Sequence, residues 1–189
     1  MPESSDRSRA LAVAGILVLA MVALYSMGRT PWGTAGGPGL WTADPASKLT
    51  SQLLTDPYTF THVNHGLVFF LVLWATTGAW LEVGDRLVVT AVLESCWEIV
   101  ENTPTVIERF REATIALGYY GDSILNSTGD ILACLLGFWI ASRLRNKWWV
   151  VGLFVALEVG LALWIRDNMT LNLLMLIHPV PAVRQWQGG

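Results

Sequence analysis

Three glutamates, Glu94, Glu98 and Glu101, lie within eight residues of one another in an otherwise apolar stretch. At about 100° of rotation per residue, an α-helix would place them within an arc of roughly 60° on one face. A single carboxylate near the centre of a bilayer costs about 3 kcal/mol even on the milder insertion scale. The three are therefore expected to be protonated, paired, metal-bound or in contact with water. Such groups can hold a metal, act as general acid and base, or relay protons. Glu98 is central in this stripe and is the first candidate for an essential residue.

Two histidines, His62 and His65, are three residues apart and can face the same neighbour if the segment is helical. Imidazole together with carboxylate is the ligand set that suits zinc or another divalent ion. We therefore predict a role in metal ligation or catalysis for this pair. The alternative is that they are interfacial hydrogen-bond donors at the start of a helix.

A second polar stripe consists of Asp122, Asn126 and Asp130, which repeat at four-residue spacing. On a helix they would span an arc near 80° and about 12 Å of its length. Two carboxylates with an amide between them can bind a hard cation or fix a substrate headgroup. Capping of a helix N-terminus explains Asp122, but it does not explain Asp130, which lies two turns farther in.

The composition places these residues in a membrane protein. Of the 189 residues 53% are apolar and only 14% are charged, ten are Trp, and the mean hydropathy is +0.46. These values lie outside the range of soluble domains and fit one integral membrane domain whose first partner is the lipid bilayer. The net charge of −3 gives no basic footprint, so nucleic acid is excluded as a partner.

We expect an all-α, polytopic membrane helix bundle of about five transmembrane helices plus an interfacial helix. The apolar runs that predict these spans are 11–27, 61–81, 87–100, 129–142 and 148–165. A polar head, residues 1–9, precedes the first run, which is predicted to be a retained anchor rather than a signal peptide. The third and fourth runs reach spanning length only when they are extended to 85–102 and 123–142, which admits polar residues. A final run, 171–177, is too short to cross and is predicted to be interfacial or re-entrant.

Two segments are predicted to lie outside the spans. Residues 30–57 are rich in Gly and Pro and should form an exposed loop with turns. Residues 104–120 alternate apolar and charged side chains, which indicates a helix on the membrane surface. Such a helix is either a lid over the polar cluster or only a connection. Its loose apolar face comprises Val106, Ile107, Phe110, Ile115 and Leu117.

Lys and Arg in the short connections set the orientation. Arg7 and Arg9 fall on the same side as Arg143, Arg145 and Lys147, which the positive-inside rule assigns to the cytoplasm. With five crossings of the bacterial inner membrane, the N-terminus is cytoplasmic and the C-terminus periplasmic. This topology gathers the histidines and both acidic stripes in the periplasmic half of the bundle, where they can pair with one another.

Four motifs carry a family resemblance. They are Asp-Pro-Tyr-Thr-Phe-Thr-His at 56–62 with His-Gly at 65–66, Trp-Glu-Ile-Val-Glu-Asn-Thr-Pro at 97–104, Tyr-Tyr-Gly-Asp-Ser-Ile-Leu-Asn-Ser at 119–127, and Ile-Arg-Asp-Asn at 165–168. Together they resemble the DUF2585 (UPF0314) family of bacterial, largely alphaproteobacterial, inner-membrane proteins. The resemblance covers 28–187 and implies a multi-pass inner-membrane location without supplying an activity. Many members carry a Cys-x-Cys after Gly-Arg and a His after Ser-Gln. Both are missing here after Arg29 and Gln52, which argues against an obligatory metal site in that loop.

The favoured hypothesis is a membrane-embedded enzyme that hydrolyses or transfers a lipid or envelope substrate. Its expected catalytic residues are Glu98, Glu101, His65 and Asp122. Its expected cofactor is a divalent metal ion held by residues from the set His62, His65, Glu94, Glu98, Asp122, Asn126 and Asp130. The alternative is a non-catalytic protein, either a cation or proton pathway or an assembly subunit. In that case the acidic residues are structural ion pairs, with Arg109, Arg111 and Arg166 as available partners.

Overall fold

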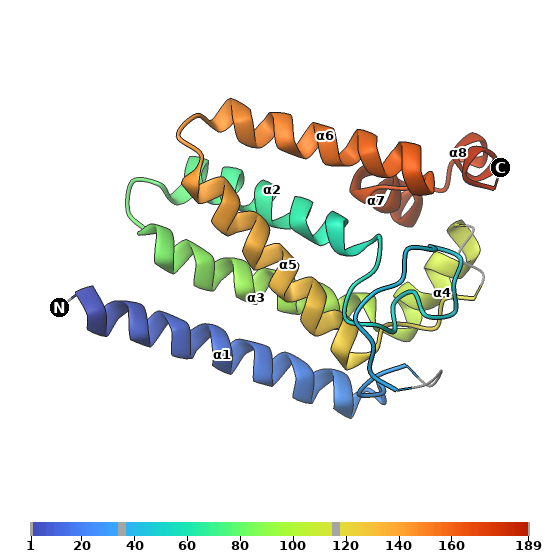
Figure 1. Ribbon diagram of the computed structural model, residues 1–189, viewed down its shortest axis with the longest axis horizontal. Coiled ribbons are helices and arrows are strands. Elements are labelled where there is room, and N and C mark those ends of the chain that lie inside the picture. Colours follow the sequence, from blue (N-terminus) through green and yellow to red (C-terminus); the bar gives the residue numbers. More distant parts are fainter. Residues whose placement is uncertain (1, 34–36, 115–117, 189) are drawn as a thin grey trace.

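The computed structural model describes residues 2–33, 37–114 and 118–188, and these form eight α-helices and no strand (Figure 1). The helices are α1 (Pro2–Ser26), α2 (Thr59–Thr77), α3 (Val83–Glu101), α4 (Pro104–Ala113), α5 (Ile124–Arg143), α6 (Lys147–Ile165), α7 (Met169–Ile177) and α8 (Pro181–Gln187). The predicted all-α class is thus confirmed. Five long helices form the bundle, and α4, α7 and α8 gather at one end of it with the C-terminus, opposite the N-terminus (Figure 1).

Three helices are long and apolar enough to cross a membrane: Ser5–Ser26 within α1, all of α5, and all of α6. The fold therefore fits a membrane protein. α2 and α3 contain 19 residues each, similar in length to α6, but both carry predicted site residues. The five long helices occur in the order of the five predicted spans.

Glycines allow α2 and α5 to pack with their backbones in contact. A Cβ atom at Gly66 of α2 would lie 2.0 Å from the carbonyl oxygen of Cys134, and one at Gly137 of α5 would lie 2.2 Å from that of Val63. Small residues commonly permit this close approach between membrane helices. It places the first turns of α2, with the two histidines, directly against α5.

The segment 30–57 differs from the prediction of an exposed loop, although Gly36 lies outside the described residues. Gln52, Leu53 and Asp56 are 3%, 7% and 1% exposed. The segment is buried because it packs against the N-terminus of α5. The first backbone amides of that helix have no acceptor within the helix and need acceptors from elsewhere. Backbone carbonyls of the segment accept from them, including Thr30 from Ile124 at 2.9 Å. The segment is therefore part of the fold around the N-terminus of α5.

The predicted surface helix exists as α4, which ends at Ala113, so Ile115 and Leu117 lie outside the described residues. Its apolar face is buried through Ile107 and Phe110. Arg109 extends from it to donate to the Leu176 carbonyl at 2.8 Å and thereby joins α4 to α7. The apolar run 171–177 lies in α7, which is too short to span a membrane. The short helix α8 was not predicted.

Candidate functional site

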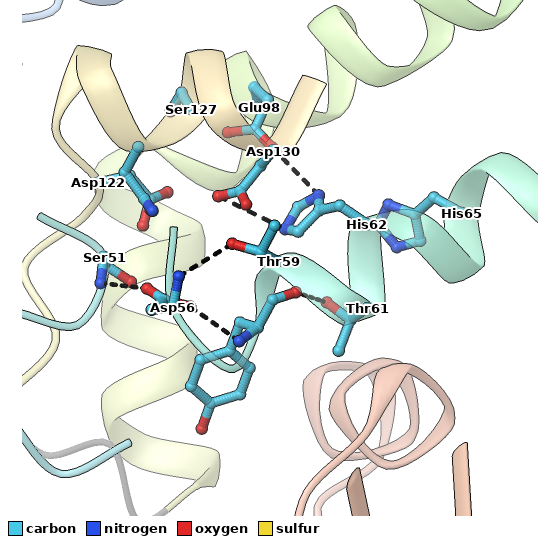
Figure 2. Close-up of polar contacts among 12 residues, drawn as sticks. Ser51, Asp56, Thr59, Thr61, His62, His65, Glu98, Asp122, Ser127 and Asp130 are labelled. Carbon is cyan, nitrogen blue, oxygen red and sulfur yellow. Dashed lines mark hydrogen bonds and ion pairs between the residues drawn. The ribbon is translucent and has the colours of Figure 1, made fainter. Parts of the chain in front are cut away.

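The candidate site forms where α2, α3 and α5 meet at the end of the bundle that also carries α4 and α7 (Figures 1 and 2). His62 of α2 is at its centre. Its Nδ1 atom lies 2.6 Å from Glu94 Oε1 and 3.4 Å from Glu98 Oε1, both of α3. Its Nε2 atom lies 3.9 Å from Asp130 Oδ2 of α5. Residues that the sequence separates by up to 68 positions therefore share one buried cluster, as the stripes predicted.

Glu94 orients both imidazole rings. Its carboxylate contacts His65 as well as His62. The Nδ1 atom of His65 lies 3.0 Å from Glu94 Oε1 and 3.1 Å from Glu94 Oε2. If each Nδ1 carries the hydrogen that Glu94 accepts, each Nε2 is left as a lone-pair donor atom. Carboxylate–histidine pairs of this kind orient the histidine ligands of metal ions. Glu94 is fully buried, and ligand atoms of His62, His65 and Glu94 lie within 4.8 Å of one another, so this carboxylate can orient the histidines or serve as a ligand beside them.

Glu98 is the least satisfied polar group of the cluster. Its side chain is fully buried, and neither carboxylate oxygen has a hydrogen-bond donor. The Oδ1 atom of Asp130 is buried and unpartnered as well. One ligand atom from each of His62, Glu98 and Asp130 lies within 4.8 Å of the other two. Buried polar groups almost always have partners, so these oxygens indicate a binding position.

A second group of carboxylates adjoins the first. Ligand atoms of Glu98, Glu101 and Asp122 also lie within 4.8 Å of one another. The Asp122 Oδ2 atom accepts from Asn102 Nδ2 at 2.9 Å and from the Tyr119 hydroxyl at 3.0 Å. Burial raises the pKa of Asp122 from its ordinary value, while hydrogen bonds such as that from Asn102 oppose the rise.

A cavity of about 340 Å³ opens beside both groups. Its polar wall includes His62, His65, Glu101, Asp122 and Asp130, so both histidines and three of the carboxylates reach it. Residues 45–52 contribute to the remaining wall, and α4, α6 and α7 add apolar side chains to it. They are Phe110, Ile165, Leu173 and Leu176. A ligand with a polar group and an apolar portion would fit this lining.

Comparisons with known proteins agree with the four motifs. The family described as "Protein of unknown function (DUF2585)" matches residues 24–189. The chain belongs to this family. A UPF0314 protein of Paracoccus denitrificans is 46% identical over 174 residues, covering 92% of this chain and 89% of the relative. UPF0314 proteins of Sphingopyxis alaskensis and Rhizobium meliloti are 43% and 44% identical, covering 97% and 95% of this chain and 97% and 90% of their own. No solved structure matches.

In this DUF2585 protein Arg109, Arg111 and Arg166 form no ion pair with the acidic cluster among the described residues. Arg109 and Arg111 donate through Nε to the backbone carbonyls of Leu176 and Tyr119. Arg166 donates to the carbonyl of Trp186 at 3.3 Å. The alternative of salt bridges from these arginines is therefore wrong for the described residues. The acceptors of Arg109 and Arg166 lie in the last turns of α7 and α8, where unpaired backbone carbonyls attract cations, and Tyr119 lies in the connection before α5.

The predicted cap of α5 changes, and Asn126 makes a contact that was not predicted. Ser123, not Asp122, caps this helix, because its hydroxyl accepts from the Asn126 amide at 3.1 Å. Asn126 lines the cavity together with both histidines, and its Nδ2 atom donates to the Leu53 carbonyl at 2.9 Å, so it also holds the 30–57 segment against the helix. Asp122 is thereby left available to the carboxylate group.

Asp56 is a buried carboxylate of the site region that the sequence reasoning did not select. It accepts from the backbone amides of Ser51 at 2.7 Å and Tyr58 at 2.8 Å, and its own amide donates to the Thr59 hydroxyl (Figure 2). Burial raises the pKa of Asp56, and these backbone hydrogen bonds oppose the rise. The Asp-Pro-Tyr-Thr sequence before α2 resembles a helix-start signal and could have identified it.

Proposed function

We propose that this protein is a membrane-embedded enzyme that uses a divalent metal ion and acid–base side chains on a lipid or envelope substrate. The observation that carries the proposal is Glu98, whose two buried oxygens have no donor although they face His62 and Asp130 (Figure 2). Leaving a charged group in this state costs several kcal/mol. A bound cation removes that cost.

The balance of charge points in the same direction. Five carboxylates occupy the two groups and their orienting position, and two histidines are the basic side chains in contact with them. The carboxylates are those of Glu94, Glu98, Glu101, Asp122 and Asp130. Buried ionised groups require compensation by partners, protons or metals. A divalent ion supplies two positive charges at the point where donors are missing.

The donor set fits such an ion. His62 offers an imidazole nitrogen, and Glu98 and Asp130 offer carboxylate oxygens, which is a mixed set used for Zn²⁺ and related ions. When bound, the ion would polarise a carbonyl or phosphoryl oxygen or lower the pKa of a water molecule. Glu101 and His65 both reach the cavity, where they can accept or donate a proton.

The proposed substrate class follows from the position and lining of the cavity. The lining contains both acidic and apolar side chains, which suits an amphiphile whose reactive group meets the carboxylates. Arg143 and Lys147 mark the turn between α5 and α6, at the opposite end of the bundle from the site (Figure 1). The positive-inside rule then supports a multi-pass inner-membrane protein with the site toward the periplasm.

Metal analysis of the full-length, detergent-purified protein tests the proposal. Wild type should carry a stoichiometric divalent metal, and Glu98→Gln and His62→Ala should lose it. Glu108→Gln, which removes an exposed carboxylate on α4, is the matched control and should retain it. Unchanged metal content in Glu98→Gln together with a large drop in melting temperature would mean that Glu98 is a structural group, and the proposal would be wrong. Wild type without metal would leave a proton pathway as the better explanation.

A further inference from the structure

Glu98 belongs to two of the ligand groups among the described residues, and this carries an inference about how many ions the site holds. We infer that Glu98 bridges two divalent cations, one bound with His62 and Asp130 and the second bound with Glu101 and Asp122. The inference rests on the proposed function, because it concerns the same site. It adds a second position of different chemistry, made only of carboxylates.

The geometry supplies the bridge. A carboxylate can offer one oxygen to each of two ions, and both oxygens of Glu98 are buried without a donor. If one ion were bound through a single oxygen of Glu98, the other oxygen would remain buried without a partner. In each group the ligand atoms lie within 4.8 Å of one another, and the groups share Glu98. Paired catalytic ions are commonly about 3.5–4 Å apart, a separation that one bridging carboxylate spans.

The second position has features of its own. The Oδ2 atom of Asp122 accepts hydrogen bonds from Asn102 and from the Tyr119 hydroxyl. Hydrogen bonds of this kind orient the ligands of metal ions. Glu101 and Asp122 both border the cavity, so an ion there would keep coordination places for water or substrate. A set of oxygens alone favours hard cations such as Mg²⁺, Mn²⁺ or Ca²⁺. The position with His62 also accepts softer ions.

Manganese is the appropriate probe because it suits both positions and is paramagnetic. The full-length protein in detergent, stripped with a chelator, is titrated with Mn²⁺, and bound metal is counted by elemental analysis while electron paramagnetic resonance reports coupling between ions. Wild type should bind two Mn²⁺ per chain with an exchange-coupled signal. Asp122→Asn should bind one, with the signal of an isolated ion. The control Glu108→Gln should match wild type.

The outcomes separate this inference from the proposed function. One Mn²⁺ in wild type, lost in Glu98→Gln, would overturn the second position and leave the single-metal enzyme standing. No Mn²⁺, Zn²⁺ or other divalent ion in wild type would overturn both. Glu101→Gln provides an independent test of the second position if Asp122→Asn does not fold. Two coupled ions retained in a folded Glu101→Gln or Asp122→Asn variant would also refute the assignment.

Discussion

The contact between α2 and α5 at Gly66 offers a test that links the packing of the bundle to the geometry of the site. An alanine Cβ at this position would lie 2.0 Å from the Cys134 carbonyl oxygen and 2.6 Å from the Phe138 amide nitrogen. Both are backbone atoms within a helix, so neither can rotate away. Gly66→Ala therefore requires α2 and α5 to separate or α2 to shift.

The size of that shift follows from the distances. Ordinary contact begins near 3.4 Å, so the 2.0 Å approach requires a local displacement of about 1.4 Å. Forcing extra volume into a packed interface typically costs about 1–3 kcal/mol. His62 and His65 lie within about one turn of Gly66 and would move with it relative to Asp130. A displacement of about 1 Å can reduce the rate of a positioned reaction about 100-fold.

Thermal unfolding and metal content measured on the purified protein would show both effects. Gly66→Ala should lower the melting temperature and weaken metal binding, whereas Gly160→Ala is the matched control. Gly160 also lies within a long helix, α6, but a Cβ atom added there would have no atom within 4 Å apart from those of its chain neighbours and its own helix backbone. Its replacement should therefore be neutral or slightly stabilising. If both variants were as stable as wild type and bound metal equally well, the proposed close packing of α2 on α5 would be refuted.

Two further predictions concern the junction between α6 and α7. Burial raises the pKa of Asp167 from 3.8 to about 7, against hydrogen bonds from Asn168 and Tyr58. Its raised pKa means that the folded protein binds the proton more tightly, so stability should be greatest below about pH 4 and decline up to about pH 7, by a few kcal/mol at most. Melting temperatures should therefore fall from about pH 4 to about pH 7 in wild type, and this part of the slope should vanish in Asp167→Asn. Glu158 accepts from Asn64 at 2.8 Å and from the first amides of α7 at 3.0 and 3.1 Å. Glu158→Ala should destabilise by about 3 kcal/mol in denaturant unfolding and Glu158→Gln by less, and equal losses would contradict the role of its oxygens.

The parts of the site that could be predicted are those encoded in helical spacing. Glu94 and Glu98 share a face because they are four residues apart, and the same holds for His62 and His65 at three. The order of apolar runs then required alternating directions, which brought the start of α2 and the end of α3 to one end of the bundle. Asp130 could be added because capping did not explain its position within α5.

The parts that could not be predicted depend on contacts between distant segments. Ser51 adopts a left-handed backbone, with φ of 64°, and its carbonyl accepts from the Ser123 amide at 2.9 Å. No local signal marks Ser51, because a non-glycine residue takes this conformation only where the surrounding structure supports it. The partners of Arg109 and Arg166 were also predicted wrongly. Side-chain charge suggested carboxylates as partners, whereas the acceptors are backbone carbonyls near helix ends.

The arrangement of the long helices explains how α2 and α3, which carry buried polar side chains, can belong to a membrane bundle. α2 and α3 carry the histidines and glutamates, and each contacts α5, while α1 packs on α3 and α6 packs on α2 (Figure 1). The three helices apolar enough to cross a membrane therefore border the two that are not. His62, Glu94 and Glu98 are buried between these helices. The free-energy cost of burying them therefore depends on the protein interior rather than on contact with lipid. A cation at Glu98 would lower that cost further, which is why metal content and stability should change together in its variants.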